Sequence, residues 1–215
     1  MTRLRFLLLS GAAAPLALAA ALAADGPPSE TCRVPRLQAV AASPGASSAA
    51  DLTRAEGVGL YLCLFGEMQA GYAQSGNRFA AEFVDWDIHN AQPFVSAGHG
   101  GRYVNTYANE AAAGYARLDE AGPMPAGAVL AMDSFSVSAA GLAAPGPLFL
   151  MEKMPAGLAA ATGDWRYTLI LPDGRIAGTS GGDGAAEVAA CHECHRKLGG
   201  ARDSLLPVPE EFRID

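Results

Sequence analysis

The sequence has little positive charge and almost no lysine. Of its 215 residues, 15 are Lys or Arg and 22 are Asp or Glu, which gives a formal net charge of −7, and only Lys153 and Lys197 are lysines. A chain with this balance cannot neutralise a run of phosphates, which excludes a nucleic-acid-binding protein. Charged residues make up only 17% of the chain, whereas hydrophobic residues make up 50%. We therefore expect a folded domain with a real core rather than a disordered chain.

Long apolar runs are missing after the first two dozen residues, and no internal repeat is visible. Two arginines precede an apolar stretch, residues 6–23, that ends in Ala-Leu-Ala. This pattern is typical of a secretory signal peptide, here residues 1–23, cleaved near Ala23. The stretch is nearly long enough for a membrane anchor, but Gly11, Pro15 and the cleavage pattern favour removal. The mature chain would carry 13 basic and 22 acidic residues, a net charge of −9. We expect a soluble, periplasmic protein without a membrane span.

Cysteine is scarce, and its four copies fall into two pairs. Cys32 and Cys63 lie in the first third of the chain, and Cys191 and Cys194 lie near its end. Because an exported chain meets an oxidising compartment, paired cysteines are expected. We predict a structural disulfide between Cys32 and Cys63, which would close a loop of about thirty residues and stabilise the fold by roughly 3 kcal/mol.

The late pair belongs to a five-residue motif, Cys-His-Glu-Cys-His at 191–195. It reads as C-x-x-C-H, the pattern of c-type haem attachment. Positions i, i+3 and i+4 share one face of a helix. Two sulfurs can therefore bond the vinyl groups on one edge of haem while the histidine reaches the iron. We predict one covalent haem c on Cys191 and Cys194, with His195 as the proximal iron ligand.

Three other interpretations of the motif stay open behind haem attachment. Structural zinc sites usually bring a second close pair of ligands, whereas only Cys32 and Cys63 remain, far upstream. A thioredoxin-type redox pair normally follows an early strand of a βαβ unit, and this motif lies near the C-terminus. A plain disulfide between Cys191 and Cys194 would leave His195 without a purpose.

We expect three regions after the signal peptide. Residues 24–50 are rich in Pro, Ser, Gly and Ala and predict an extended lead-in. Residues 51–78 predict a helical segment, with Asp51 as the N-cap of a helix through Tyr72. Residues 79–215 form the predicted haem domain.

The predicted haem domain combines strands and short helices. Strand-forming residues with a period of two predict strands, at 102–107, 128–137, 147–154, 165–171 and 175–178. Asn109 is expected to cap a helix through Arg117, and Asp183 a helix over 184–198 that carries the haem motif. Sequential strands with tight turns favour an antiparallel sheet. The predicted fold class is α+β, a mainly antiparallel sheet with flanking helices and haem on a C-terminal helix.

Several short stretches occur in a specific order between about residues 79 and 208. They are His-Gly-Gly-Arg-Tyr at 99–103, Tyr-Ala-Asn-Glu-Ala-Ala at 107–112, Gly-Ala-Val at 127–129, Leu-Met-Glu-Lys at 150–153, Gly-Asp-Trp at 163–165, Leu-Pro-Asp-Gly at 171–174, and the haem motif. This order resembles the cytochrome P-460 family and its relatives, the beta-type cytochromes c-prime. The resemblance implies a β-rich fold and one covalent haem with His195 as proximal ligand. It also implies an iron face open to small nitrogen species such as nitric oxide.

The resemblance also bears on catalysis. In the hydroxylamine-oxidising members of the family a lysine bonds the haem edge, and the matching position here is Val104, which cannot form that bond. Neither Lys153 nor Lys197 stands at that position. The resemblance therefore implies a ligand-binding cytochrome, with a hydroxylamine-oxidising oxidoreductase as the alternative. A second alternative is an electron carrier with Met132 or Met151 as sixth iron ligand, although a strand methionine is more often core filling.

The remaining candidates are weaker. His89 and His99 could ligate iron, although hydrogen-bonding roles are commoner, and His99 could instead meet a haem propionate. His192 is expected to point away from the haem face. Glu152 and Lys153 are expected on a solvated strand face. The sequence leaves the redox partner open, and also whether the protein forms a homodimer.

Overall fold

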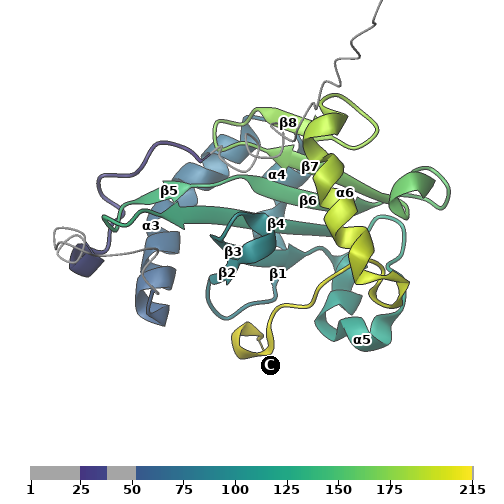
Figure 1. The fold of residues 1–215 in the computed structure, drawn as a ribbon, viewed down its shortest axis with the longest axis horizontal. Coiled ribbons are helices and arrows are strands. Elements are labelled where there is room, and N and C mark those ends of the chain that lie inside the picture. Colours follow the sequence, from purple (N-terminus) through teal and green to yellow (C-terminus); the bar gives the residue numbers. More distant parts are fainter. Residues whose placement is uncertain (1–24, 38–51, 215) are drawn as a thin grey trace, which may run out of the picture.

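The computed structural model describes residues 25–37 and 52–214, and it has an α+β fold built on one antiparallel sheet (Figure 1). The predicted signal peptide, residues 1–23, lies outside the described residues. Within them the sheet has eight strands. These are β1 (Asp87–Ile88), β2 (Phe94–Ser96), β3 (Arg102–Ala108), β4 (Val129–Val137), β5 (Ala143–Pro145), β6 (Leu148–Lys153), β7 (Trp165–Ile170) and β8 (Ile176–Thr179).

The strand order confirms the predicted α+β class with a mainly antiparallel sheet, whereas haem on the C-terminal helix stays a prediction. The sheet runs β1-β3-β4-β6-β7-β8, with β2 also beside β3 and β5 also beside β4, and each of these pairings is antiparallel. The five predicted strands correspond to β3, β4, β6, β7 and β8, with each end within one residue of the prediction. The other three strands were not predicted, because two or three residues are too few for an alternating pattern to show.

Helices and 3-10 helices cover both faces of the sheet. The α-helices are α3 (Arg54–Ala73), α4 (Arg78–Glu82), α5 (Leu118–Ala121) and α6 (Ala189–His195). The 3-10 helices are η1 (Phe83–Asp85), η2 (Ala97–His99), η3 (Glu110–Arg117), η4 (Ala160–Thr162), η5 (Ala185–Val188), η6 (Arg196–Leu198), η7 (Gly200–Arg202) and η8 (Glu210–Phe212). In Figure 1, α3 lies behind the sheet and α6 crosses in front of it. None of the helices in the described part of the chain has the length and apolar character needed to cross a membrane.

Helix α3 begins two residues later than predicted, because a stronger cap follows Asp51. Thr53 is the N-cap, and its side chain accepts a hydrogen bond from the backbone N–H of Glu56. The Glu56 carboxylate in turn accepts from the backbone N–H of Thr53, which completes a capping box. The N-cap of this helix is therefore Thr53 rather than the predicted Asp51, which lies outside the described residues, and the helix ends at Ala73, one residue past the predicted end.

Helix α3 and the sheet share a closed apolar core, which we call the α3-side core. Leu64, Met68 and Tyr72 on α3 are almost wholly buried against Phe135 of β4 and Ile170 of β7. Burying side chains of this size stabilises a fold by about 1.5–3 kcal/mol each. The helical segment predicted over 51–78 is thus packed against the sheet of the predicted haem domain.

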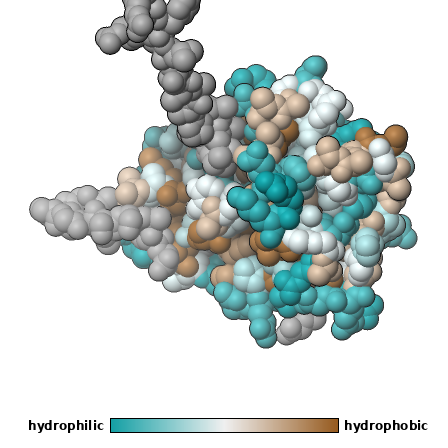
Figure 2. Space-filling model, turned by 45° about the vertical axis from the view of Figure 1, so that its right-hand side comes forward, coloured by the Kyte–Doolittle hydropathy of each residue, from teal (hydrophilic) through white to brown (hydrophobic). Residues whose placement is uncertain are grey.

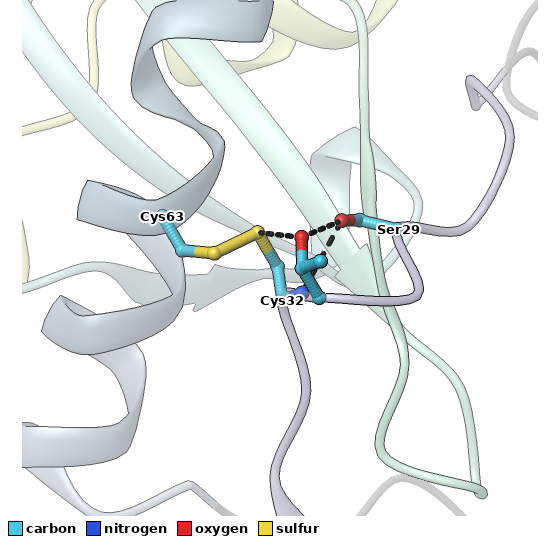
Figure 3. The surroundings of a disulfide bond; sticks show 4 residues. Ser29, Cys32 and Cys63 are labelled. Atoms are coloured by element: carbon cyan, nitrogen blue, oxygen red, sulfur yellow. Dashed lines mark hydrogen bonds between the residues drawn. A yellow bond between two sulfur atoms is a disulfide. The ribbon is translucent and has the colours of Figure 1, made fainter.

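The lead-in is tied to this core by backbone hydrogen bonds and a disulfide. Gly26 N–H donates to Pro145 O over 2.7 Å, so the start of the lead-in runs beside β5. Residues 35–37 are helical rather than extended, which corrects that part of the prediction. Cys32 and Cys63 form a disulfide between the lead-in and α3, with Cα atoms 5.7 Å apart (Figure 3). Ser29 Oγ accepts from the Cys32 N–H over 3.2 Å and fixes the turn at the bond. Of the predicted lead-in, residues 24 and 38–50 lie outside the described part.

The opposite face carries shorter and less regular elements. Asn109 caps the first of them as predicted, by accepting from the Ala112 N–H, but the segment through Arg117 is 3-10 rather than α. The predicted helix over 184–198 is three pieces, η5, α6 and η6, and Asp183 does not cap it. Gly184 stands between Asp183 and η5 in the left-handed region, with φ of 64°. The Asp183 side chain is therefore one residue too early to reach the first free N–H groups.

Candidate functional site

The C-x-x-C-H motif lies on α6, on the face of the sheet away from α3 (Figure 1). Cys191 is half-buried and packs against an apolar cluster that includes Tyr167 and Leu169 of β7. Cys194 is exposed, and both thiols are unpaired. The open interpretation of a Cys191–Cys194 disulfide is therefore not the arrangement in this structure. On the part of the surface that Figure 2 shows, hydrophilic and apolar residues are interspersed.

His195 is held with one ring nitrogen engaged and the other free to bind. Its Nδ1 lies 2.9 Å from the backbone oxygen of Ser204, which can only accept, so Nδ1 carries the proton. Burial lowers the pKa of His195, which favours the neutral imidazole. A neutral ring with a protonated, hydrogen-bonded Nδ1 presents the Nε2 lone pair, and metal-bound histidines are commonly held in this way.

The rings of Tyr167 and His99 lie close to His195. The ring centroid of Tyr167 lies 5.6 Å from that of His195, and the His99 centroid lies 6.4 Å away. Phe149 of β6 packs edge-on against His99 at 4.7 Å. The Nδ1 of His99 pairs with Ser96 Oγ over 2.8 Å. Burial, with His195 and Arg102 nearby, lowers the pKa of His99 to about 4, so this ring is neutral as well.

Two buried polar atoms beside the motif have no hydrogen-bond partner among the described residues. They are the hydroxyl of Tyr167 and the Nδ1 of His192, and the two rings lie 6.2 Å apart. The His192 side chain is turned toward the sheet, and the prediction that it points away from the haem face stays a prediction. His192 and His195 are three residues apart on α6 and so share its sheet-facing side, where both flank Tyr167.

This donor set fits a covalently bound haem. Two unpaired thiols and an imidazole with a free nitrogen are the groups that attach haem c and ligate its iron. An unsatisfied buried hydroxyl costs about 1–3 kcal/mol, so Tyr167 favours a bound group that offers an acceptor.

A structural zinc site, another interpretation that the sequence left open, has too few ligands here. Cys32 and Cys63, which were its only further thiols, are joined in a disulfide. Within the described residues no group of three or more His, Cys, Asp or Glu could hold a metal ion.

Three further residues that the sequence singled out, Met132, Met151 and Val104, lie in or against the apolar cluster that Cys191 contacts. Met132 and Met151 belong to or pack against the same cluster as Cys191, and their strand partners are Phe149 and Tyr167 respectively. Their role as a sixth ligand stays a prediction. Val104 of β3 is fully buried in this cluster.

His89 lies apart from the motif. It lines a separate groove of about 230 Å³ with Tyr115, Arg117 and Arg213. Burial lowers the pKa of His89. Its ring packs edge-on against that of Tyr115, with the centroids 5.0 Å apart.

Lys153 does not lie on a solvated strand face, which corrects the prediction for the Glu152–Lys153 pair. Its side chain is 11% exposed and forms an ion pair with Asp203 at 2.7 Å. The Nζ atom also donates to the Gly163 carbonyl and lies 4.9 Å from the Trp165 ring centroid. Glu152 pairs with Arg166.

Sequence reasoning missed Ser204, Asp203 and Tyr167. Ser204 acts through its backbone carbonyl, for which no side-chain pattern exists. Asp203 meets Lys153 across fifty residues of sequence, a separation that no local motif spans. The one available signal was Tyr167, an aromatic on a predicted strand, which reads equally well as core.

Comparison of the chain with protein-family models finds no match, and comparison with curated proteins finds none. The resemblance to the cytochrome P-460 family therefore stays a prediction.

Proposed function

We propose that this protein is an exported c-type cytochrome that carries one haem on Cys191 and Cys194, with His195 as proximal iron ligand. The observation that carries the proposal is the hydrogen bond from His195 Nδ1 to the Ser204 carbonyl, beside two unpaired thiols on the same short helix. When bound, the haem would supply an iron centre able to take a small ligand or an electron. The protein's part is to fix the imidazole and to keep the surroundings apolar and aromatic.

We further propose that the second face of the iron is open to a small ligand such as nitric oxide. Two observations favour this function over hydroxylamine oxidation, which the resemblance links to a lysine bonded to haem. The matching position is Val104, a buried hydrocarbon. Lys153 is already engaged by Asp203 and Gly163. A periplasmic location follows from the predicted signal peptide and belongs to the same proposal.

The experiment is an optical titration of the protein expressed with its leader in a host that matures c-type cytochromes. The proposal predicts a red protein whose reduced form is five-coordinate and high-spin and whose spectrum changes on adding nitric oxide. Glu193→Ala, an exposed position inside the motif, is the matched control and should behave like the parent. A low-spin reduced spectrum that nitric oxide leaves unchanged would reject the open iron face.

The same spectra test the electron-carrier alternative. If Met132 or Met151 ligates iron, the oxidised protein has a weak band near the red end of the spectrum, and one of Met132→Ala and Met151→Ala abolishes it. Under our proposal the band is absent from the parent, and both variants keep the parent spectrum in the visible region.

A further inference from the structure

The loop that follows the motif holds an unusual backbone conformation at the point where it meets His195. Asp203 and Ser204 are consecutive non-glycine residues with φ of 49° and 64°. Side chains other than glycine rarely adopt this left-handed region, and such strain persists only where surrounding contacts hold it. The Ser204 carbonyl that this conformation presents is the acceptor for His195 Nδ1.

Asp203 makes the contacts that hold the loop. Its Oδ1 accepts from Lys153 Nζ over 2.7 Å, and its Oδ2 accepts from the Met124 N–H over 3.0 Å. Its backbone carbonyl accepts from Trp165 Nε1 over 2.8 Å. One residue is thus fixed at three atoms by partners from three other segments of the chain.

Two partners of Asp203, Lys153 and Trp165, belong to neighbouring strands of the sheet. Trp165, the first residue of β7, is fully buried. Lys153 ends β6, and the two strands pair at Lys153 and Trp165. The side chains of Lys153 and Asp203 are only 11% and 13% exposed, so water screens their attraction weakly. The contacts therefore connect the ends of two inner strands, β6 and β7, to the backbone that orients His195.

We infer that Asp203 is a positioning residue for His195: by anchoring the strained loop to Lys153 and Trp165, it holds the Ser204 carbonyl against the imidazole Nδ1–H. The inference rests on the proposed function, in which His195 ligates haem iron. A carbonyl that accepts from Nδ1 makes the imidazole a stronger donor and stabilises the oxidised iron. Loosening the loop should weaken that donation and favour the reduced form.

The test compares Asp203→Asn with the parent, both loaded with haem. Asparagine keeps the shape but loses the charge that pairs with Lys153. We expect unchanged haem content, an iron–histidine stretching band at lower frequency in the reduced protein, and a reduction equilibrium shifted by about tenfold, or about 59 mV, toward the reduced form. Lys153→Met, which keeps an apolar side chain beside Trp165, should shift both readouts in the same direction by less. It also serves as the test if Asp203→Asn does not fold.

Asp173→Asn is the matched control, because Asp173 pairs with Arg175 in an exposed position far from the motif in sequence. It should leave both readouts at the parent values. If Asp203→Asn and Lys153→Met lower thermal stability while the band and the equilibrium stay at the parent values, Asp203 is structural only and the inference is wrong. If the parent carries no haem, the proposed function fails, and that result is visible before any variant is compared.

Discussion

The two faces of the sheet differ in how fully their cysteines and buried polar groups are paired. On the α3 side, the cysteines are joined in a disulfide and a buried carboxylate has its hydrogen bonds. On the α6 side, the cysteines are unpaired, and the Tyr167 hydroxyl and His192 Nδ1 beside the motif are buried without described partners, as are His89 Nε2 and Thr106 Oγ1.

The polar network of the α3 side illustrates a complete arrangement. Asp133 is 1% exposed, and it accepts from Tyr61 over 2.8 Å and from Asn105 Nδ2 over 3.0 Å. Tyr61 also pairs with the Tyr107 hydroxyl, and Asn90 donates to Asn105. Natural proteins satisfy most of their buried polar groups. The α6 side keeps buried polar atoms without described partners, and it is the side on which we propose that haem binds.

Removing the disulfide should give the largest loss of stability without touching the α6 side. Cys32→Ala with Cys63→Ala frees a loop with a sequence separation of 31 residues. We expect the free energy of unfolding to fall by about 3–4 kcal/mol, because the unfolded chain gains freedom. Denaturant unfolding measures the loss, and haem content per chain should equal that of the parent. Loss of haem in a variant that still folds would contradict the claim that the disulfide on the α3 side and haem attachment on the α6 side are independent.

The pH dependence of stability tests the buried carboxylate. Burial raises the pKa of Asp133 to about 6, against an ordinary value of 3.8, although Tyr61 and Asn105 oppose the rise. Between about pH 4 and 6 the folded state holds this proton more tightly than the unfolded state, so stability from this group falls as pH rises and is constant above that range. The decrease should be on the order of 2–3 kcal/mol.

Asp133→Asn removes that titration while keeping a group that can meet both partners. Unfolding free energies at successive pH values should therefore show the variant gaining on the parent between about pH 4 and 6. A difference that stays constant over this range would show that Asp133 does not titrate there.

Removing one tyrosine hydroxyl from each side should give the smallest changes in the free energy of unfolding, and the two variants can be compared directly. Tyr61→Phe leaves Asp133 and Tyr107 each short of a partner and should cost about 1–3 kcal/mol. In the chain without haem, Tyr167→Phe removes an atom that has no described partner and should leave stability unchanged or slightly higher. Denaturant unfolding of both variants measures each loss in the free energy of unfolding relative to the parent. Equal losses would mean that Tyr167 has a partner in solution.

The sequence predicted the elements whose signals are local and repeated. The runs of strand-forming residues at 102–107, 128–137, 147–154 and 165–171 identified four long strands of the sheet. Most residues of these strands are buried, because helices cover both faces of the sheet. The caps were less predictable. Asp51 and Asp183 were chosen by residue type, but Thr53 has a partner three residues on and Gly184 interrupts the helix start.

The motif residues of the candidate site were predictable, whereas their surroundings were not. Cys191, Cys194 and His195 are adjacent in the chain, so their spacing alone indicates shared chemistry. Asp203, Lys153 and Trp165 meet only because β6 and β7 pair and the final loop returns to them. Contacts of that kind depend on the tertiary fold and leave no mark in a single sequence.

The most direct test of the account is the intact mass of the chain, unfolded in acid after expression with cytochrome maturation, with peptide mapping of the attachment site. We predict the mass of one haem retained on the unfolded chain and located on the peptide with Cys191 and Cys194, and its loss in Cys191→Ala with Cys194→Ala. A colourless protein whose two late thiols both react with an alkylating reagent would contradict the account.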